Sequence, residues 1–278
     1  MLIFKTKSDL SSYLATLTDS LIGFVPTMGA LHEGHLALLL KAKKQSSVVV
    51  CSIFVNPTQF DSKKDFNRYP DTLSDDITKL EKINCDVLYV PTASDLYAIN
   101  EKAKHFNFNG LDNVMEAKFR KGHFDGVATI IEKFFNIIKP HKAYFGQKDL
   151  QQLLIVKSLT KQLNLPIEIV SVPTMREENG LAMSSRNKLL NAKQKLVASM
   201  LYESLAFCKA NKDTLKIREL KTHLEKQFSE QLEVDLEYLE FVDANNLHPI
   251  TVFKENDNNA VCIGAYVGGV RLIDNIIF

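Results

Sequence analysis

Two histidines that stand three residues apart could act together on one ligand. His32 and His35 belong to the stretch Pro-Thr-Met-Gly-Ala-Leu-His-Glu-Gly-His at residues 26–35. On the first turn of a helix, this spacing places both imidazoles on the same side. A helix N-terminus also offers free backbone N–H groups and a partial positive charge, so it attracts phosphate. The pattern predicts a phosphate site at residues 28–35, which we call the histidine turn.

A surface pair and half of a metal site are the alternative interpretations of these histidines. Neither a cysteine nor a third histidine lies nearby in the sequence to complete a zinc set, which counts against the metal. The flanking segments favour the phosphate site, because residues 21–25 are typical of a strand and residues 36–40 of a helix body. Gly29 and Gly34 lack a Cβ, so backbone and ligand can approach closely between these elements.

A second candidate stretch, residues 54–60, follows a predicted strand and contains Asn56 and Gln59. Their amides can bind hydroxyl and carboxylate groups without carrying charge. The alternative is an Asn-Pro turn with a solvated glutamine. Parallel sheets bind ligands past the carboxyl ends of their strands, so the position alone makes these amides candidates.

A third candidate stretch, residues 146–152, leads from a predicted strand into a helix. Lys148 could neutralise a phosphate oxygen, and Asp149 could accept a hydrogen bond from a ribose hydroxyl. Gln152 lies one helical turn further on and could face the same cavity. Taken alone, Lys148 and Asp149 are also compatible with an ordinary surface pair.

A fourth candidate stretch, residues 176–187, contains Ser184, Ser185 and Arg186. Two hydroxyl groups beside a guanidinium form a suitable phosphate clamp. Ser184 or Ser185 could equally be an N-cap of the next helix. Both interpretations can hold together, because capping and phosphate binding use the same helix end. We call residues 183–186 the serine–arginine segment.

The composition is that of an ordinary globular protein of 278 residues, with 45% hydrophobic and 24% charged residues. A net charge of +1 gives no reason to expect nucleic acid or an anionic membrane as a partner. The four scattered cysteines indicate small buried residues in a reducing compartment. No signal peptide is recognisable, and no apolar run approaches the ~18 residues of a membrane helix, so we expect a cytoplasmic protein.

Strands and helices alternate through the first part of the chain. Apolar runs predict strands at residues 48–55, 86–90, 143–146 and 167–170, and helical spacing predicts helices at residues 74–83, 124–138 and 150–163. This alternation predicts a mostly parallel sheet with helices on both faces. Two amphipathic helices (187–209 and 215–232) and three strands (236–241, 260–266 and 270–273) follow. We therefore expect an α/β domain at residues 1–174 and a smaller α+β domain at residues 175–278, with a hinge near Pro173.

Taken together, these stretches resemble the pantothenate synthetase (pantoate–β-alanine ligase) family. The resemblance follows the family's order at residues 26–35, 54–60, 69–70, 122–129, 145–152, 176–187 and 271–275. The His-x-Gly-His motif alone would indicate only nucleotidyl transfer, but its combination with Gly-Gln-Lys-Asp and Met-Ser-Ser-Arg-Asn is far more specific. The resemblance implies a Rossmann-like nucleotidyltransferase domain that binds ATP and pantoate, with a C-terminal α+β lid.

The family's reaction has two steps. The carboxylate of (R)-pantoate attacks the α-phosphorus of ATP, which releases pyrophosphate and leaves a pantoyl adenylate. The amine of β-alanine then attacks this mixed anhydride to give pantothenate and AMP. The resemblance therefore implies ATP, pantoate and β-alanine as partners, Mg²⁺ carried mainly by the ATP phosphates, and a homodimer.

The resemblance also implies roles for individual residues. ATP would contact Met28, Gly29, Ala30, Leu31, His32, Glu33, Gly34, His35, Gly146, Gln147, Lys148, Asp149, Met175, Met183, Ser184, Ser185 and Arg186. The catalytic residues would be His32, His35, Lys148 and Arg186, with His35 as the proton donor. Gln59 and Gln152 would hold pantoate, and Gln59 would also contact β-alanine. Asp75 and Asp76 match positions sometimes linked to the metal.

The chain departs from the family pattern at three places. Asp71 replaces the usual arginine, Lys121 replaces a frequent proline, and Asp125 replaces a basic or small residue. None of these positions is assigned to chemistry. His123, which has a glycine on each side of the His-Phe-Asp triplet, receives no role from the sequence.

Two other functions share the histidine motif. A plain nucleotidylyltransferase would not need the paired amides Gln59 and Gln152 or a lid that carries the serine–arginine segment. A non-catalytic nucleotide sensor would be expected to lack His35, Lys148 or Arg186, and all three are present. These residues favour the ligase.

Overall fold

The computed structural model describes residues 1–60, 66–67, 69–255 and 258–278. Its larger sheet has six parallel strands in the order β1-β4-β3-β2-β5-β6. These strands are β1 (Leu2–Phe4), β2 (Ile22–Thr27), β3 (Val48–Ile53), β4 (Val87–Tyr89), β5 (Lys142–Gly146) and β6 (Glu168–Val172). The predicted parallel α/β sheet is confirmed, and the strand β1 and the helix after it are additions that the sequence analysis did not predict.

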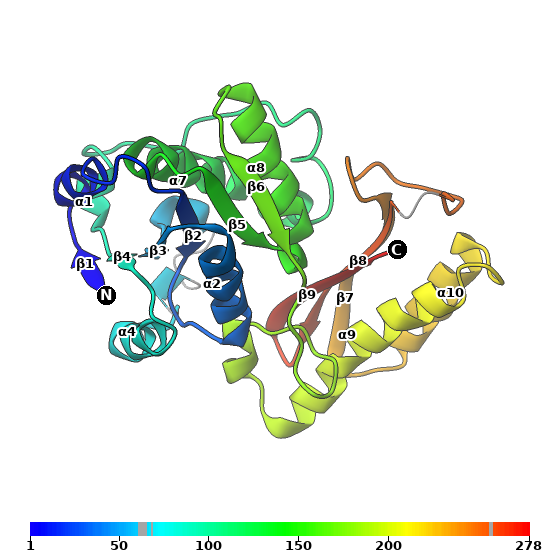
Figure 1. Cartoon of the computed structure of the whole chain (residues 1–278). Coiled ribbons are helices and arrows are strands. Elements are labelled where there is room, and N and C mark those ends of the chain that lie inside the picture. The colour runs from blue at the N-terminus through cyan, green and yellow to red at the C-terminus, as the bar shows by residue number, and fades with distance from the viewer. Residues whose placement is uncertain (61–65, 68, 256–257) are drawn as a thin grey trace.

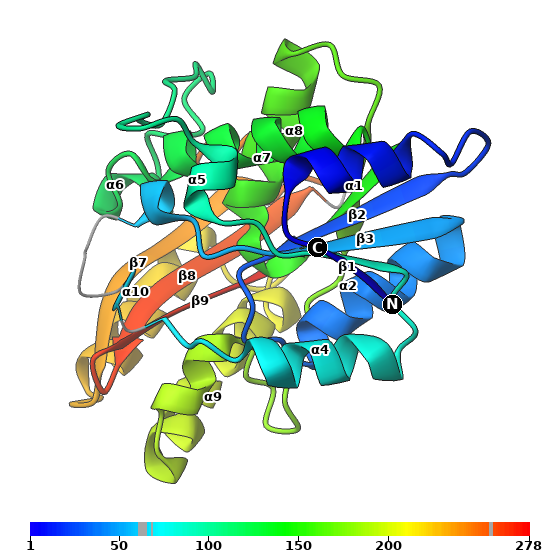
Figure 2. The same ribbon diagram turned by 90° about the vertical axis from the view of Figure 1, so that its left-hand side faces the viewer.

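Helices cover both faces of this sheet (Figure 2). One face carries α1 (Lys7–Leu14), α7 (His123–Ile138) and α8 (Leu150–Gln162), whose apolar residues form a common core with the sheet. The other face carries α2 (Glu33–Gln45) and α4 (Leu73–Lys82), which pack in a second core. Two short helices, α5 (Ala93–Leu96) and α6 (Glu116–Phe119), lie in the connection that precedes α7.

The strand order places the switch point of the sheet between β2 and β5. The chain proceeds from β2 to β3 on one side, whereas β5 pairs with the other side of β2. Ligands of open α/β sheets bind in the crevice beyond the strand ends at such a point. The histidine turn follows β2 and residues 147–149 follow β5, so two candidate stretches meet at this crevice.

The C-terminal part forms a three-stranded antiparallel sheet of β7 (Val234–Asp243), β8 (Asn259–Val267) and β9 (Val270–Ile277). Helices α9 (Ala192–Ala210) and α10 (Ile217–Ser229) cover one of its faces and form a core of their own with it (Figure 1). Tyr238, Val242 and Cys262 belong instead to the core shared with α7 and α8. The smaller sheet is therefore packed against both its own helices and the first part of the chain.

Two boundaries differ from the sequence prediction for identifiable reasons. The predicted helix 187–209 is divided into a 3-10 helix (Ser185–Leu189) and α9, because Ser184 caps the first and Asn191 caps the second. Strand β9 continues beyond the predicted residue 273, although Asp274 and Asn275 interrupt its apolar pattern. Both polar residues are buried with hydrogen-bond partners, which allows the strand to include them.

None of the helices in the described part of the chain combines the length and the apolar character needed to cross a bilayer.

Candidate active site

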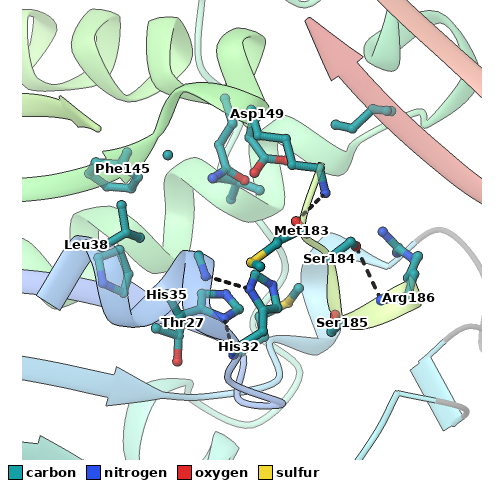
Figure 3. A pocket seen from close by; sticks show the side chains of 18 of the residues that line it. Thr27, His32, His35, Leu38, Phe145, Asp149, Met183, Ser184, Ser185 and Arg186 are labelled. Atoms are coloured by element: carbon teal, nitrogen blue, oxygen red, sulfur yellow. Dashed lines mark hydrogen bonds between the residues drawn. The ribbon is translucent and has the colours of Figure 1, made fainter. Parts of the chain in front are cut away.

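A cavity lies at the crevice and is lined by both parts of the chain (Figure 3). Most of the residues that the sequence analysis singled out line it, namely Met28, His32, Gly34, His35, Gln59, Gly146, Lys148, Asp149, Gln152, Met175, Met183, Ser184, Ser185 and Arg186. Gly29, Ala30, Leu31, Glu33 and Gln147 are outside this lining set and belong to the backbone that carries it. We call this space the central cavity.

The backbone of the histidine turn is held by a buried carboxylate. Asp76 of α4 accepts hydrogen bonds from the N–H groups of Ala30 and Leu31, both at 2.8 Å, and from the Thr72 hydroxyl at 3.0 Å. Gly29 and Ala30 have φ values of +79° and +49°, so the turn passes through the left-handed region. Asp76 thus compensates the two backbone donors that this sharp turn leaves without partners.

The two imidazole rings lie side by side at the start of α2, with centroids 4.1 Å apart and planes tilted by 35°, and the spacing had placed them on the same side of the turn. His32 is the N-cap, and its Nδ1 accepts a hydrogen bond from the Gly34 N–H at 3.1 Å. The Nδ1 of His35 accepts one from the His32 N–H at 3.4 Å. A backbone N–H can only donate, so each Nδ1 lacks a proton and each neutral ring carries its proton on Nε2.

Both histidines are neutral near pH 7. Burial lowers the pKa of His32 to about 4, with smaller contributions from the positive charges of Lys148, Lys188 and Lys79. Burial also lowers the pKa of His35 well below its ordinary value, and His32 and Lys148 add to the effect. The pair therefore offers two Nε2–H donors to a ligand without the cost of a buried positive charge.

The two aspartates that the resemblance links to a metal lie outside the cavity lining. Asp76 is fully buried and both of its oxygens already accept hydrogen bonds from the histidine turn. Asp75 is exposed on α4. Within the described ranges, no group of three or more His, Cys, Asp or Glu residues is placed to hold a metal ion. Asp76 therefore has structural partners in the histidine turn, and neither aspartate lines the cavity.

The amide orientation of Gln59 follows from its neighbours. The Nδ2 of Asn56 donates to the Gly126 carbonyl at 3.1 Å and to the Gln59 Oε1 at 3.2 Å. Because a carbonyl only accepts, the Asn56 atom that faces it is the nitrogen, and the Gln59 atom next to that nitrogen is the oxygen. Gln59 then directs its Nε2 donor toward the thioether of Met28, a weak acceptor that a stronger one can replace.

The opposite side of the cavity supplies positive charge. Lys148 lies in the 3-10 helix Gln147–Asp149, and its Nζ donates to the Met183 carbonyl at 3.2 Å. Burial lowers the pKa of Lys148, although Asp149 and Asp274 act in the other direction. Arg186 lies in the 3-10 helix that Ser184 caps, and the Ser184 Oγ accepts from its N–H at 3.3 Å. The capping interpretation of Ser184 is confirmed.

The serine–arginine segment depends on residues far away in the sequence. It follows a short hairpin in which Arg176 pairs with Ala182, and Met183 donates to the Met175 carbonyl at 2.9 Å. Arg176 binds Asp274 of β9 through two hydrogen bonds of 2.5 and 3.0 Å. This bidentate pair joins the hairpin to the smaller sheet.

Some lining residues received no role from the residues alone. Tyr69 lines the cavity and is hydrogen-bonded to Ser185, and burial raises its pKa. Arg120 and Arg271 line it as well. Asn275 donates to the carbonyls of Gln147 and Lys148 at 2.9 and 2.7 Å and so fixes the turn that carries Lys148. The matched family segments contain Tyr69, Arg271 and Asn275 but not Arg120.

The arrangement is suited to a polyanion beside a smaller polar ligand. Two neutral N–H donors and the N-terminus of α2 line the same cavity as Lys148 and Arg186. Gln59 and Gln152 supply uncharged polar groups to the same space. Such a site can bind phosphates and stabilise charge that develops on them, while the amides orient a second reactant.

Comparisons with known proteins agree with this geometry. A family model described as Pantoate-beta-alanine ligase matches residues 2–277. A pantothenate synthetase from Cytophaga hutchinsonii is 45% identical over 259 residues, which are 92% of this chain and 91% of the relative. One from Azobacteroides pseudotrichonymphae is 42% identical over the full length of both chains.

Solved structures give the same result. Pantothenate synthetase from Thermus thermophilus has 35% sequence identity and a TM-score of 0.91, with 99% of each chain covered. A pantoate–β-alanine ligase from Francisella tularensis, complexed with β-γ ATP and β-alanine, has 35% identity and a TM-score of 0.82 over 100% of this chain and 97% of that one. The chain described here belongs to the pantoate–β-alanine ligase family.

Proposed function

We propose that this chain condenses pantoate with β-alanine in an ATP-dependent reaction that passes through a pantoyl adenylate. The observation that supports it most is the meeting of three groups in one cavity: the paired histidines, the cations Lys148 and Arg186, and the amides Gln59 and Gln152. A carboxylate is a poor acyl donor until one of its oxygens becomes part of a good leaving group. Adenylation provides that leaving group.

In the first step, a pantoate carboxylate oxygen forms a bond to the α-phosphorus, and the bond from this phosphorus to pyrophosphate breaks. The Nε2–H groups of His32 and His35 donate to phosphate oxygens, and Lys148 and Arg186 balance the charge that moves onto pyrophosphate. Since both histidines are neutral, His35 acts first as a hydrogen-bond donor, and any proton it gives leaves from Nε2.

In the second step, the β-alanine amine forms a C–N bond to the pantoyl carbonyl, and the C–O bond to AMP breaks. Gln59 and Gln152 hold the pantoyl group in both steps, and Gln59 also contacts β-alanine. The Nε2–H of Gln59 is suited to this role because its partner among the described residues is the Met28 thioether. A pantoate oxygen is a better acceptor and would replace the sulfur.

Magnesium fits this site as an ion carried by ATP. Mg²⁺ usually keeps several waters and binds to phosphates with one or two carboxylates. Asp149 contributes a carboxylate to the cavity lining, whereas Asp76 is engaged by the histidine turn. When bound, the ion would neutralise phosphate charge next to Lys148. Asp149 is the residue that we propose to be near it, in preference to Asp75 or Asp76.

Four broader expectations remain proposals. The division into residues 1–174 and 175–278 is supported by the change from a parallel to an antiparallel sheet after Pro173. Closure of the second unit over ATP is tested by comparing scattering profiles with and without ATP and pantoate. The homodimer is tested by light scattering, and the cytoplasmic location by cell fractionation.

The function is tested by measuring pyrophosphate release from ATP and Mg²⁺ with pantoate alone, with β-alanine alone and with both. We expect a pantoate-dependent burst that becomes steady turnover only when β-alanine is added. Release that ignores pantoate would indicate a nucleotidylyltransferase with another acceptor. No release under any condition would indicate a nucleotide sensor.

A further inference from the structure

His123 is a buried histidine that the proposed reaction does not use. It is the first residue of α7, and only 7% of its surface is exposed. Its Nδ1 lies 2.8 Å from the carbonyl oxygen of Gln59, and its Nε2 lies 3.1 Å from the Nη1 of Arg120. Because a carbonyl accepts and a guanidinium donates, Nδ1 carries the proton and Nε2 accepts.

The protonation state of His123 is as fixed as its tautomer. Burial lowers its pKa to about 3, and the nearby charge of Arg120 contributes in the same direction. The ring is therefore neutral near pH 7 and exchanges no proton during turnover. It forms a rigid link between the guanidinium of Arg120 and the backbone of Gln59.

From Arg120, the chain of contacts continues through Glu116 to the smaller sheet. Arg120 lies 3.7 Å from the carboxylate of Glu116, and Arg271 of β9 binds the same carboxylate through hydrogen bonds of 2.6 and 2.7 Å. The Tyr238 hydroxyl of β7 donates to it at 2.8 Å. Burial opposes the ionisation of Glu116, but the contacts with Arg271 outweigh it and lower the pKa of Glu116.

At its other end, the hydrogen-bonded chain from Arg120 through His123 reaches the turn at residues 56–59, which packs directly on α7. A Cβ added to Gly126 would stand 2.2 Å from the Thr58 carbonyl oxygen and 2.8 Å from the Gln59 Cα, so the glycine permits this close contact. Asn56 binds the Gly126 carbonyl, and His123 binds the Gln59 carbonyl. The first hydrogen bond attaches the Asn56 side chain to α7 and the second attaches the Gln59 carbonyl, so both ends of the turn at residues 56–59 are held on this helix.

We propose that His123 is a positioning residue, which holds the Gln59 carbonyl on α7 and thereby sets where the Gln59 amide meets pantoate and β-alanine. The inference rests on the proposed function, because it deepens the role given to Gln59. His123 is not among the residues that line the central cavity. Its effect on pantoate and β-alanine runs through the position of Gln59, and its contact with Arg120, which also lines the cavity, is a second route that the variants below separate.

The test compares variants that keep or remove the Nδ1–H donor. His123→Asn retains a nitrogen donor at nearly the same position, whereas His123→Phe retains the ring and leaves the buried Gln59 carbonyl without a partner. We expect the apparent KM for pantoate to rise about tenfold or more in His123→Phe and to stay near the wild-type value in His123→Asn. The KM for ATP should change less than twofold in both.

A double-variant cycle separates positioning from general loosening of the structure. If His123 acts through Gln59, adding His123→Phe to Gln59→Ala should raise the pantoate KM no further. His105→Ala is the matched control. His105 contacts Asp125 of α7, the helix that carries His123, but the His105 side chain is 82% exposed. Its kinetics should equal those of the wild-type chain.

The outcomes are distinct. Wild-type protein without pantoate-dependent pyrophosphate release would refute the proposed function before any variant is measured. With an active wild type, a pantoate KM within twofold of normal in folded His123→Phe would overturn the inference. An effect that persists in full beside Gln59→Ala would do the same. If the Phe variant does not fold, His123→Gln replaces it, since its amide reaches toward Arg120 and not the Gln59 carbonyl.

Discussion

The histidine turn is fixed by residues of its own part of the chain, whereas the serine–arginine segment opposite it is fixed by strand β9. Asp76, which holds the turn, lies on α4 of the same α/β unit. Asp274, which holds the hairpin before the segment, lies ninety-eight residues beyond its partner Arg176. One side of the cavity is thus built within the α/β unit, and the other by the docking of the smaller sheet.

Because the two sides of the cavity are held by different contacts, ATP binding can be weakened from either side independently. The two histidines and the N-terminus of α2 keep their geometry as long as the apolar core between the larger sheet, α2 and α4 is intact. Met183, Ser184 and Arg186 reach the cavity only while the hairpin is attached to β9. We therefore expect changes near β9 to weaken ATP binding without altering the protonation of the histidines.

The largest effect is expected from Arg176→Met. It leaves the carboxylate of Asp274, whose side chain is only 2% exposed, without its cation. Removing one partner of a buried ion pair typically costs about 3–5 kcal/mol of the free energy of unfolding. The KM for ATP should rise in parallel, which thermal unfolding and steady-state kinetics would measure.

Two further variants serve as controls for this test. Arg218→Met removes an arginine from the exposed face of α10 and should leave unfolding unchanged. Adding Asp274→Asn to Arg176→Met should restore part of the stability, because an amide tolerates burial better than an unpaired carboxylate. An Arg176→Met protein as stable as the wild type would show that the segment does not depend on β9.

The next effect concerns the chemistry on the histidine side. In His35→Ala we expect the rate of adenylate formation to fall about 10²-fold or more, the usual scale for one transition-state contact. Single-turnover release of pyrophosphate with saturating ATP and pantoate measures this step. Near-normal turnover would remove His35 from the mechanism. An unchanged melting temperature would show that the loss is catalytic.

A smaller effect is expected at the carboxylate beneath the histidine turn. Asp76→Ala leaves the N–H groups of Ala30 and Leu31 buried without an acceptor, which should cost about 1–3 kcal/mol of the free energy of unfolding. Asp75→Ala, on the exposed side of the same helix, should change neither stability nor the Mg²⁺ dependence of turnover. If Asp75→Ala shifts the Mg²⁺ dependence, the metal site lies at α4 after all.

The smallest effect is a pH dependence of stability. The folded pKa of His32, about 4, lies below its ordinary value of 6.5, so the unfolded chain binds the proton more readily. This contribution is fully present above pH 6.5 and is lost as the pH falls from 6.5 toward 4. His32→Asn should reduce the loss by about 1 kcal/mol, since the ring is partly open to screening solvent. Denaturant unfolding between these pH values would measure it, and identical slopes for both proteins would contradict it.

The sequence analysis succeeded where structure is decided by neighbouring residues. The strand, turn and helix around the histidine turn were predicted because residues 21–40 show an apolar run, glycines and a helical pattern in direct succession. It was less successful at β9, where Asp274 and Asn275 broke the strand pattern. Those two residues are tolerated in a buried strand only because Arg176, Gln147 and Lys148 provide partners there.

Asp76 shows the same dependence on tertiary contacts. The family resemblance links Asp75 and Asp76 to a metal through their positions in the matched pattern. In the folded chain, the two oxygens of Asp76 bind the backbone N–H groups of Ala30 and Leu31. A carboxylate can serve either purpose, and only the position of its neighbours distinguishes them.

The sequence by itself determined the family, the parallel α/β sheet and the residues that carry chemistry, because these depend on motif order and on local periodicity. Only the tertiary structure decided which nitrogen of each histidine carries the proton and what holds the cavity together. Those features depend on contacts such as Asp76 with Ala30, Asn275 with Lys148 and Arg271 with Glu116. The partners in these contacts are separated in the sequence by 46, 127 and 155 positions. No local pattern encodes such pairs, since each partner is polar and its hydrogen bonds could be satisfied equally well by water until folding brings the two together.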